Sequence, residues 1–107
     1  MIEVTATPKF MRLAKKSMTE EAIQSLIDSL ALDPEKGTLI AGTGGIRKLR
    51  WATGKGGGKR GGLRILYYYD GEHIVLLITL FKKADQENIE ASEKEELRKL
   101  IKELFGD

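Results

Sequence analysis

The stretch HIVLLITLFKK, residues 73–83, most constrains the fold of this chain. A strand with one wet face alternates apolar and polar side chains, whereas a strand covered on both faces reads as a nearly continuous apolar run. We therefore expect a central strand that is covered on both faces. A chain of 107 residues has room for one modest core. A single domain over residues 1–107, built around this strand, is predicted.

Two shorter runs precede the central strand and read as its antiparallel neighbours. Residues 46–53, IRKLRWAT, and residues 63–70, LRILYYYD, have strand-forming composition, and Asp70 with Gly71 provides a tight hairpin turn into the central strand. A three-stranded meander follows. Because side chains alternate along a strand, Lys48 and Arg50 share one face of the first run.

The remaining elements are a first strand and three helices. IEVTAT at 2–7 reads as the strand, and Thr7 followed by Pro8 starts a helix over 8–16. Capping-box spacings predict the other two helix starts, at Ser17 with Glu20 and at Ser92 with Glu95, whereas DPEKG at 33–37 ends the second helix and 39–45 reads as a glycine-rich turn. The predicted fold class is α+β: a small antiparallel sheet, made of the N-terminal strand and the meander, with an N-terminal helical hairpin and a C-terminal helix on one side.

Positive charge is concentrated in the middle of the chain. The formal net charge is only +2, yet between Glu35 and Asp70 there is no acid and there are eight basic residues. Such a block indicates one cationic face, for which phosphate-bearing partners are the natural match. A solvated surface with chance clustering of charge is the alternative.

Strand pairing predicts where these cations meet. In a sheet ordered 46–53, 63–70, 73–83, Arg50 and Arg64 lie close together, with Lys82 or Lys83 beside them and Lys48 one step inward. The glycine-rich segment GKGGGKRGG, 54–62, connects the two basic strands at the same end and reads as a grip for phosphates.

Clustered cations can bind phosphates, and arginine does so with two parallel hydrogen bonds. In RNA cleavage without a metal, the 2′-hydroxyl attacks phosphorus, and cations stabilise the extra negative charge. A lysine serves as the base only where neighbouring cations lower its pKa. A sheet edge decorated with lysine and arginine against aggregation is the alternative without chemistry.

Other classes of protein are disfavoured by composition. There is no cysteine and a single histidine, His73, which excludes disulfides, thiolate metal sites and His-pair catalysis. No metal or cofactor is expected. The N-terminus lacks a signal-peptide pattern, and the longest apolar run is too short to span a bilayer, so a cytoplasmic protein without a membrane partner is expected.

The stretch GTGGIRKLRWATGKGGGKRGGLRILYYY resembles the core of the HigB-type branch of RelE/ParE-superfamily toxins, from type II toxin–antitoxin systems, with the likeness running from about Asp33 to Leu104. The resemblance implies a RelE-like toxin that cuts messenger RNA, generally at the translating ribosome. The catalytic residues it implies here are Lys48, Arg50, Arg64 and Lys83. Contacts with messenger or ribosomal RNA are expected from Arg47, Lys55, Lys59, Arg60 and Lys82. Some relatives carry a catalytic tyrosine near the position of Ile89.

The resemblance also implies partners. One is a cognate antitoxin, a small protein with a DNA-binding part, and operator DNA is bound only through the toxin–antitoxin complex. The others are messenger RNA and the ribosome. Two further functions stay open at this point: a non-catalytic basic nucleic-acid-binding module, such as an inactive toxin relative, and a gyrase-inhibiting toxin of the ParE type.

Overall fold

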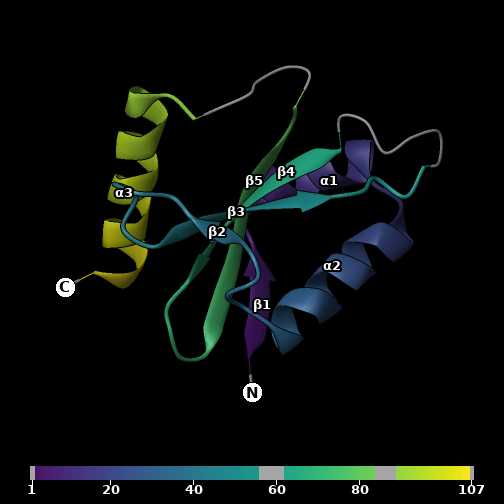
Figure 1. The fold of residues 1–107 in the computed structure, drawn as a ribbon, viewed down its shortest axis with the longest axis horizontal. Coiled ribbons are helices and arrows are strands. Elements are labelled where there is room, and N and C mark those ends of the chain that lie inside the picture. The colour runs from purple at the N-terminus through teal and green to yellow at the C-terminus, as the bar shows by residue number, and fades with distance from the viewer. Residues whose placement is uncertain (1, 56–61, 84–88, 107) are drawn as a thin grey trace.

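The computed structural model describes residues 2–55, 62–83 and 89–106 of the chain. Their elements run in the order β1 (Glu3–Ala6), α1 (Pro8–Ser17), α2 (Glu20–Leu32), β2 (Thr38–Leu39), β3 (Ile46–Trp51), β4 (Leu63–Tyr69), β5 (Ile74–Lys82) and α3 (Ala91–Phe105). The strands form one sheet in the order β1-β5-β4-β3-β2 (Figure 1). The predicted α+β class and the antiparallel meander β3-β4-β5 are confirmed.

Strand β5 is covered on both faces, as its continuous apolar sequence predicts. Val75, Leu77 and Leu80 belong to one core, whereas Leu76 and Ile78 belong to a second. A register shift in the β4–β5 pairing, at Leu66/Tyr67, explains why Leu77 and Leu80 face the same side although they are three residues apart.

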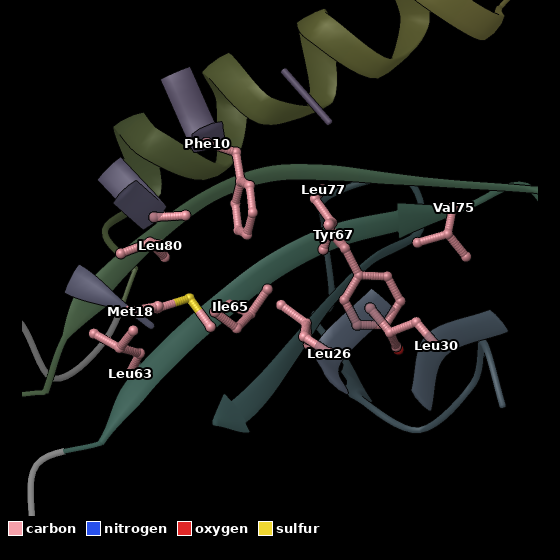
Figure 2. Close-up of a cluster of buried hydrophobic side chains, with 11 residues drawn as sticks. Phe10, Met18, Leu26, Leu30, Leu63, Ile65, Tyr67, Val75, Leu77 and Leu80 are labelled. Carbon is pink, nitrogen blue, oxygen red and sulfur yellow. The ribbon is translucent and has the colours of Figure 1, made fainter. Parts of the chain in front are cut away.

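The first core lies between the sheet and helices α1 and α2. Its fully buried members include Phe10 from α1, Leu26 and Leu30 from α2, and Ile65 and Tyr67 from β4 (Figure 2). Both helices therefore bury their apolar stripes against the same face of the sheet, which is the expected arrangement for amphipathic helices.

The second core lies under α3, on the opposite face of the sheet from α1 and α2 (Figure 1). Ile101 packs there with Ile46 and Leu66, and the rings of Tyr68 and Phe105 stack with centroids 4.8 Å apart. The prediction that all helices lie on one side of the sheet is wrong. A strand that is apolar on both faces needs cover on both faces, and α3 is the element left to provide it.

Two details of the sheet also differ from the prediction. Strand β1 runs parallel to β5, so the sheet is mixed and not wholly antiparallel. Thr38 and Leu39 form β2, a two-residue edge strand paired with β3, where a turn had been expected from residue 39. Neither detail has a local signal, because strand direction depends on the path of the whole chain and two residues show no periodicity.

Helix starts were predicted well only where proline marks them. Thr7 caps α1 by accepting a hydrogen bond from the Phe10 backbone N–H at 3.0 Å, with Pro8 at the first helical position, as predicted. The start of α2 is capped by Thr19 and not by Ser17, and the capping box of α3 is Glu90 with Glu93 and not Ser92 with Glu95. Glu95 instead forms an ion pair with Arg98.

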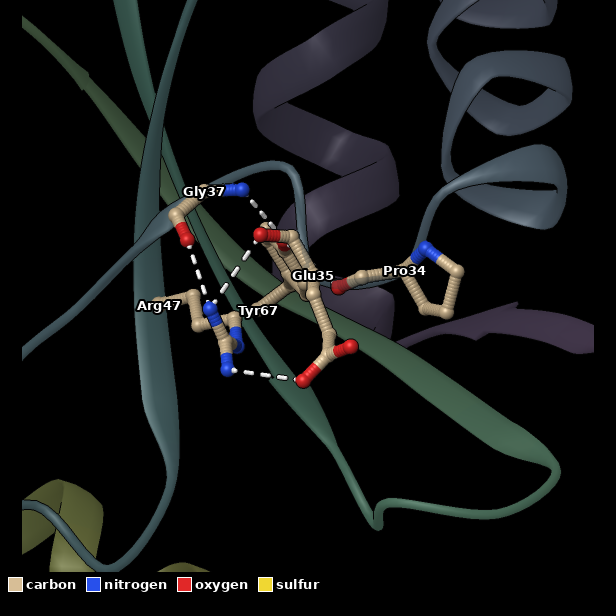
Figure 3. Close-up of polar contacts among 5 residues, drawn as sticks. All are labelled: Pro34, Glu35, Gly37, Arg47 and Tyr67. Atoms are coloured by element: carbon tan, nitrogen blue, oxygen red, sulfur yellow. Dashed lines mark hydrogen bonds and ion pairs between the residues drawn. The ribbon is translucent and has the colours of Figure 1, made fainter.

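The side chain of Tyr67 ties the turn after α2 to the sheet (Figure 3). Its buried hydroxyl donates a hydrogen bond to the Pro34 carbonyl at 2.8 Å and accepts one from the Gly37 backbone N–H at 2.8 Å. Burial raises the pKa of Tyr67. The approach is close, because a Cβ on Gly37 would lie 2.9 Å from a ring carbon of Tyr67.

Replacing Tyr67 by Phe is expected to lower the free energy of unfolding by about 1–3 kcal/mol, because two buried backbone groups lose their partner. Tyr69→Phe is the matched control on the same strand. The Tyr69 side chain makes no hydrogen bond within the described residues, so its change stays within about 0.5 kcal/mol. Urea unfolding measures both, and equal losses would contradict this role of Tyr67.

The hairpin turn between β4 and β5 depends on a carboxylate. Asp70 Oδ1 accepts hydrogen bonds from the backbone N–H groups of Glu72, His73 and Ile74 at 2.8, 2.9 and 3.0 Å. The bonds from Ile74 and Glu72 are the main causes that lower the pKa of Asp70. Gly71 adopts a φ of 88°, which the Asp-Gly turn requires.

A lowered pKa in the folded state means that the unfolded chain binds the proton more tightly. The stabilisation by Asp70 is therefore present above the unfolded pKa of about 3.9 and is lost as the pH falls through the folded pKa. The stability difference between wild type and Asp70→Asn should shrink between pH 6 and pH 3. Glu103→Gln, at an exposed carboxylate of α3, should show no comparable trend, and a difference that is constant with pH would contradict the assignment.

Candidate nucleic-acid interface

Three of the predicted site residues come together by strand register. Arg50 lies directly opposite Arg64, and Lys48, two pairs further along, lies opposite Leu66. Paired residues share a face, so these cations lie on the same face as Leu66, which is the side covered by α3. The predicted closeness of Arg50 and Arg64, with Lys48 one step inward on the same face, is confirmed. We call Lys48, Arg50 and Arg64 the cation row.

Arg64 is the unusual member of the cation row. Only 8% of the residue is exposed, and within the described residues its guanidinium makes one long hydrogen bond, 3.4 Å from Nη1 to the Gly62 carbonyl, and no ion pair. Buried charges in proteins are normally paired. The opposite residue, Arg50, adds repulsion, because like charges directly across a sheet destabilise it. An anion held between the two arginines would relieve both costs.

The next two predicted site residues, Lys82 and Lys83, lie at the end of β5. Lys82 pairs with Leu63, whose side chain belongs to the first core, so Lys82 lies toward the face of α1 and α2. Lys83 follows directly, two residues beyond Phe81, which pairs with Arg64. Both lysines are exposed at the end of the sheet that carries Arg50 and Arg64.

Arg47 is on the same strand as Lys48 and Arg50 but is held on the other face. Its Nη1 donates hydrogen bonds to the carbonyls of Gly37 at 2.8 Å and Glu35 at 3.2 Å, and its Nη2 lies 3.6 Å from the Glu35 carboxylate (Figure 3). The side chain is 19% exposed. The structure thus separates Arg47 from the cation row and gives it a place in the turn that Tyr67 also holds.

The predicted contacts from the glycine-rich segment have only one described member. Lys55 extends its ammonium group to the Lys16 carbonyl at 2.9 Å, near the end of α1, where a cation also favours the helix dipole. Lys59 and Arg60 lie outside the described residues, so nothing is said of their positions.

Sequence reasoning missed a fourth cation next to the cation row. A surface pocket of about 280 Å³ is lined by Thr38, Leu39, Ile40, Lys48, Ile89 and Lys94. Lys94 comes from the first turns of α3 and lies across this pocket from Lys48. Helical periodicity gives Lys94 only a place beside the apolar stripe, and its meeting with Lys48 depends on how α3 packs on the sheet. Ile89, near the position where some relatives carry a tyrosine, is half-buried against the second core.

The part of the chain that the structure describes contains no group of three or more His, Asp or Glu residues placed to hold a metal ion. It also contains no helix long and apolar enough to cross a membrane.

Together these features define a small α+β protein with one mixed sheet, helices on both faces, and at one end of one face two arginines, Arg50 and Arg64, that form no ion pair within the described residues. Comparison with known protein families adds that residues 2–106 match the RelE family, described as the RelE toxin of the RelE/RelB toxin–antitoxin system. The chain therefore belongs to the RelE toxin family. Toxins of this family pair with an antitoxin of the RelB type.

The different surroundings of Arg47 and Arg64 lead to opposite expectations for stability. Arg64→Met should leave the free energy of unfolding unchanged or raise it, because within the described residues the Arg64 charge has no acidic partner and faces Arg50. Arg47→Met should lower it by about 1–3 kcal/mol, because backbone acceptors in the 33–37 turn lose their donor. Urea unfolding of the two variants tests this. A large loss for Arg64→Met would show that Arg64 is a structural residue.

Proposed function

We propose that this chain is a HigB-type toxin and a single toxin domain, an endoribonuclease that cuts messenger RNA on the translating ribosome and thereby stops translation. The observation that carries the proposal is Arg64, a residue that is only 8% exposed, has no acidic partner in the described residues and lies directly opposite Arg50. Membership of the RelE family supports a toxin, and the cation row supports a phosphodiester substrate.

The proposed reaction needs no group beyond the RNA and the protein. The 2′-hydroxyl on the 5′ side of the cut loses its proton and bonds to phosphorus, and the bond to the 5′-oxygen of the next nucleotide breaks. The products are a 2′,3′-cyclic phosphate and a 5′-hydroxyl, which gains a proton. The non-bridging oxygens carry their greatest negative charge midway, when five oxygens surround phosphorus. Arg64 and Arg50 are placed to donate hydrogen bonds to the non-bridging oxygens at that stage.

Proton transfer is assigned to the lysines on either side of the two arginines. Lys48 lies two pairs inward and Lys83 lies just beyond the end of β5. Ile89 supplies no hydroxyl, so a tyrosine at that position has no part in the proposed chemistry.

Binding of the RNA strand is assigned to the cations that surround the cation row. Lys82 and Lys55 are exposed at the same end of the sheet, Lys59 and Arg60 belong to the glycine-rich segment, and Lys94 joins them across the pocket from Lys48. Arg47 is left out of this set, because its guanidinium is engaged by Glu35 and Gly37. Phosphate contacts of this kind give affinity without sequence preference.

The physiological setting follows from the same proposal. The chain acts in the cytoplasm, where ribosomes and messenger RNA are found. A cognate antitoxin neutralises it, and the complex of the two binds operator DNA through the antitoxin's DNA-binding part.

Induced expression of the wild type should arrest growth and produce discrete cuts in messenger RNA, mapped by primer extension. Arg64→Ala and Arg50→Ala should each relieve the arrest, because loss of one donor to the transition-state charge lowers a rate by about 100- to 1,000-fold. Lys48→Ala should relieve it as well, because loss of a proton-transfer group lowers a rate by about 100- to 10,000-fold. Lys36→Ala, at an exposed lysine in the turn after α2, is the matched control and should stay toxic.

Three outcomes would argue against the proposal. Intact messenger RNA during growth arrest would point to another target, such as gyrase. A harmless wild type that still binds RNA would indicate a non-catalytic module. Equal activity of Arg64→Ala and Lys36→Ala would remove the cation row from the reaction. Far-UV circular dichroism of each variant shows whether a loss of toxicity is only a loss of folding.

A further inference from the structure

A second surface pocket, of about 360 Å³, lies on the same face as the cation row, between α3, the start of α1 and the sheet. Its walls include Leu66, Ile78 and Thr79 from the sheet and Leu97 and Leu100 from α3. We call it the α1–α3 pocket. Its size is that of a small-molecule site, and such sites combine apolar walls with a few polar groups.

The α1–α3 pocket is continuous with the cation row through the sheet. Leu66 is paired with Lys48 and is two residues from Arg64 on β4, and Thr79 is paired with Leu66 and is two residues from Phe81 on β5. Two residues of a strand span roughly 7 Å. One nucleotide can therefore place its phosphate on the arginines and its base in the pocket.

Unlike the cation row, the α1–α3 pocket has acids among its polar groups, with a single lysine, Lys9, beside them. The Thr7 hydroxyl is already occupied, since it donates to the Ile78 carbonyl at 2.6 Å and accepts from the Phe10 N–H at 3.0 Å. Glu93 accepts from the Glu90 N–H in the capping box. Glu96 makes no hydrogen bond or ion pair within residues 2–55, 62–83 and 89–106, and is left as an acceptor on the pocket wall.

A carboxylate is a poor neighbour for a phosphate but a good partner for the edge of a base. Guanine presents two adjacent donors, N1–H and the N2 amino group, to the two oxygens of one carboxylate. Adenine and cytosine each present a single amino group beside a ring nitrogen that accepts hydrogen bonds, and this nitrogen repels a carboxylate oxygen. Uracil presents one donor between two acceptors. The aliphatic walls from the sheet and α3 suit the flat faces of an unstacked base.

We propose that the α1–α3 pocket binds a guanine base next to the phosphate held by Arg64 and Arg50, and that Glu96 reads its N1–H and N2 amino edge. This inference rests on the proposed function, because it takes the bound phosphate to belong to RNA. It makes Glu96 a specificity-determining residue, whereas the arginines supply affinity and chemistry.

The direct test is an NMR titration with the four nucleoside monophosphates, in their 5′ and 3′ forms, followed at the methyl groups of Ile78, Leu97 and Leu100. Guanosine monophosphate should shift these methyl signals and bind at least about fivefold more tightly than the other three, since a good bidentate base contact discriminates by 1–3 kcal/mol. Glu96→Gln should abolish that preference and leave the affinity for adenosine monophosphate unchanged. Glu103→Gln, on the same helix outside the pocket, is the control and should keep the preference.

Several results would overturn the inference. Shifts confined to the cation row would mean that only the phosphate is bound. Equal affinity for the four nucleotides, or a guanine preference that survives Glu96→Gln, would remove the assigned role of Glu96. Methyl signals that move only when purified antitoxin is added would assign the α1–α3 pocket to an apolar segment of that protein.

Cleavage mapping in cells separates this inference from the proposed function. Cuts with guanine enriched at one fixed position, lost in Glu96→Gln, support both. Cuts without such a guanine, together with no preference in the titration, overturn the pocket and leave the ribonuclease intact. A guanine preference in the titration without any cutting supports the pocket and contradicts the ribonuclease.

Discussion

The structure depends on one strand, β5, whose two apolar faces must both be removed from water. Helices α1 and α2 cover one face, so α3 has to return to the other. The cover on the second face is centred on Ile101, which packs over Ile46 and Leu66. Arg50 and Arg64 lie further along β3 and β4, where Arg50 is exposed. The demand of a single strand for burial thus leaves one end of one face available, and Arg50 and Arg64 lie there.

Much of this could be predicted from the sequence, because it rests on short-range rules. Period-two alternation and tight hairpin pairing place Arg50 opposite Arg64 and Lys48 two pairs inward. Apart from the capping residues of α2 and α3, the predictions that were wrong concern long-range contacts. The direction of β1, the side chosen by α3 and the meeting of Lys94 with Lys48 all depend on how distant elements pack. No window of sequence contains that information.

Arg47 and Arg64 show why a count of positive charges does not locate a site. Both are arginines on neighbouring strands in the same basic block, and both have little exposure. Arg47 is satisfied by Glu35 and by backbone carbonyls, so its charge is used within the fold. Arg64 has one long hydrogen bond within the described residues and a like charge opposite. Folding alone gives no reason to keep such a group, and binding an anion does.

The same reasoning separates the two kinds of contact that an RNA makes on this face. Cations that bind phosphates hold any strand equally well, so the cation row alone would give a protein that grips RNA without choosing where. Selection among RNA bases requires a polar group that is directed at the edge of a base and is surrounded by apolar side chains. Glu96 is an acid on the wall of the α1–α3 pocket, which it shares with Lys9, and within the described residues it forms no ion pair or hydrogen bond with a cation. Its proposed role uses this carboxylate to select among bases, which is a function that the cation row cannot perform.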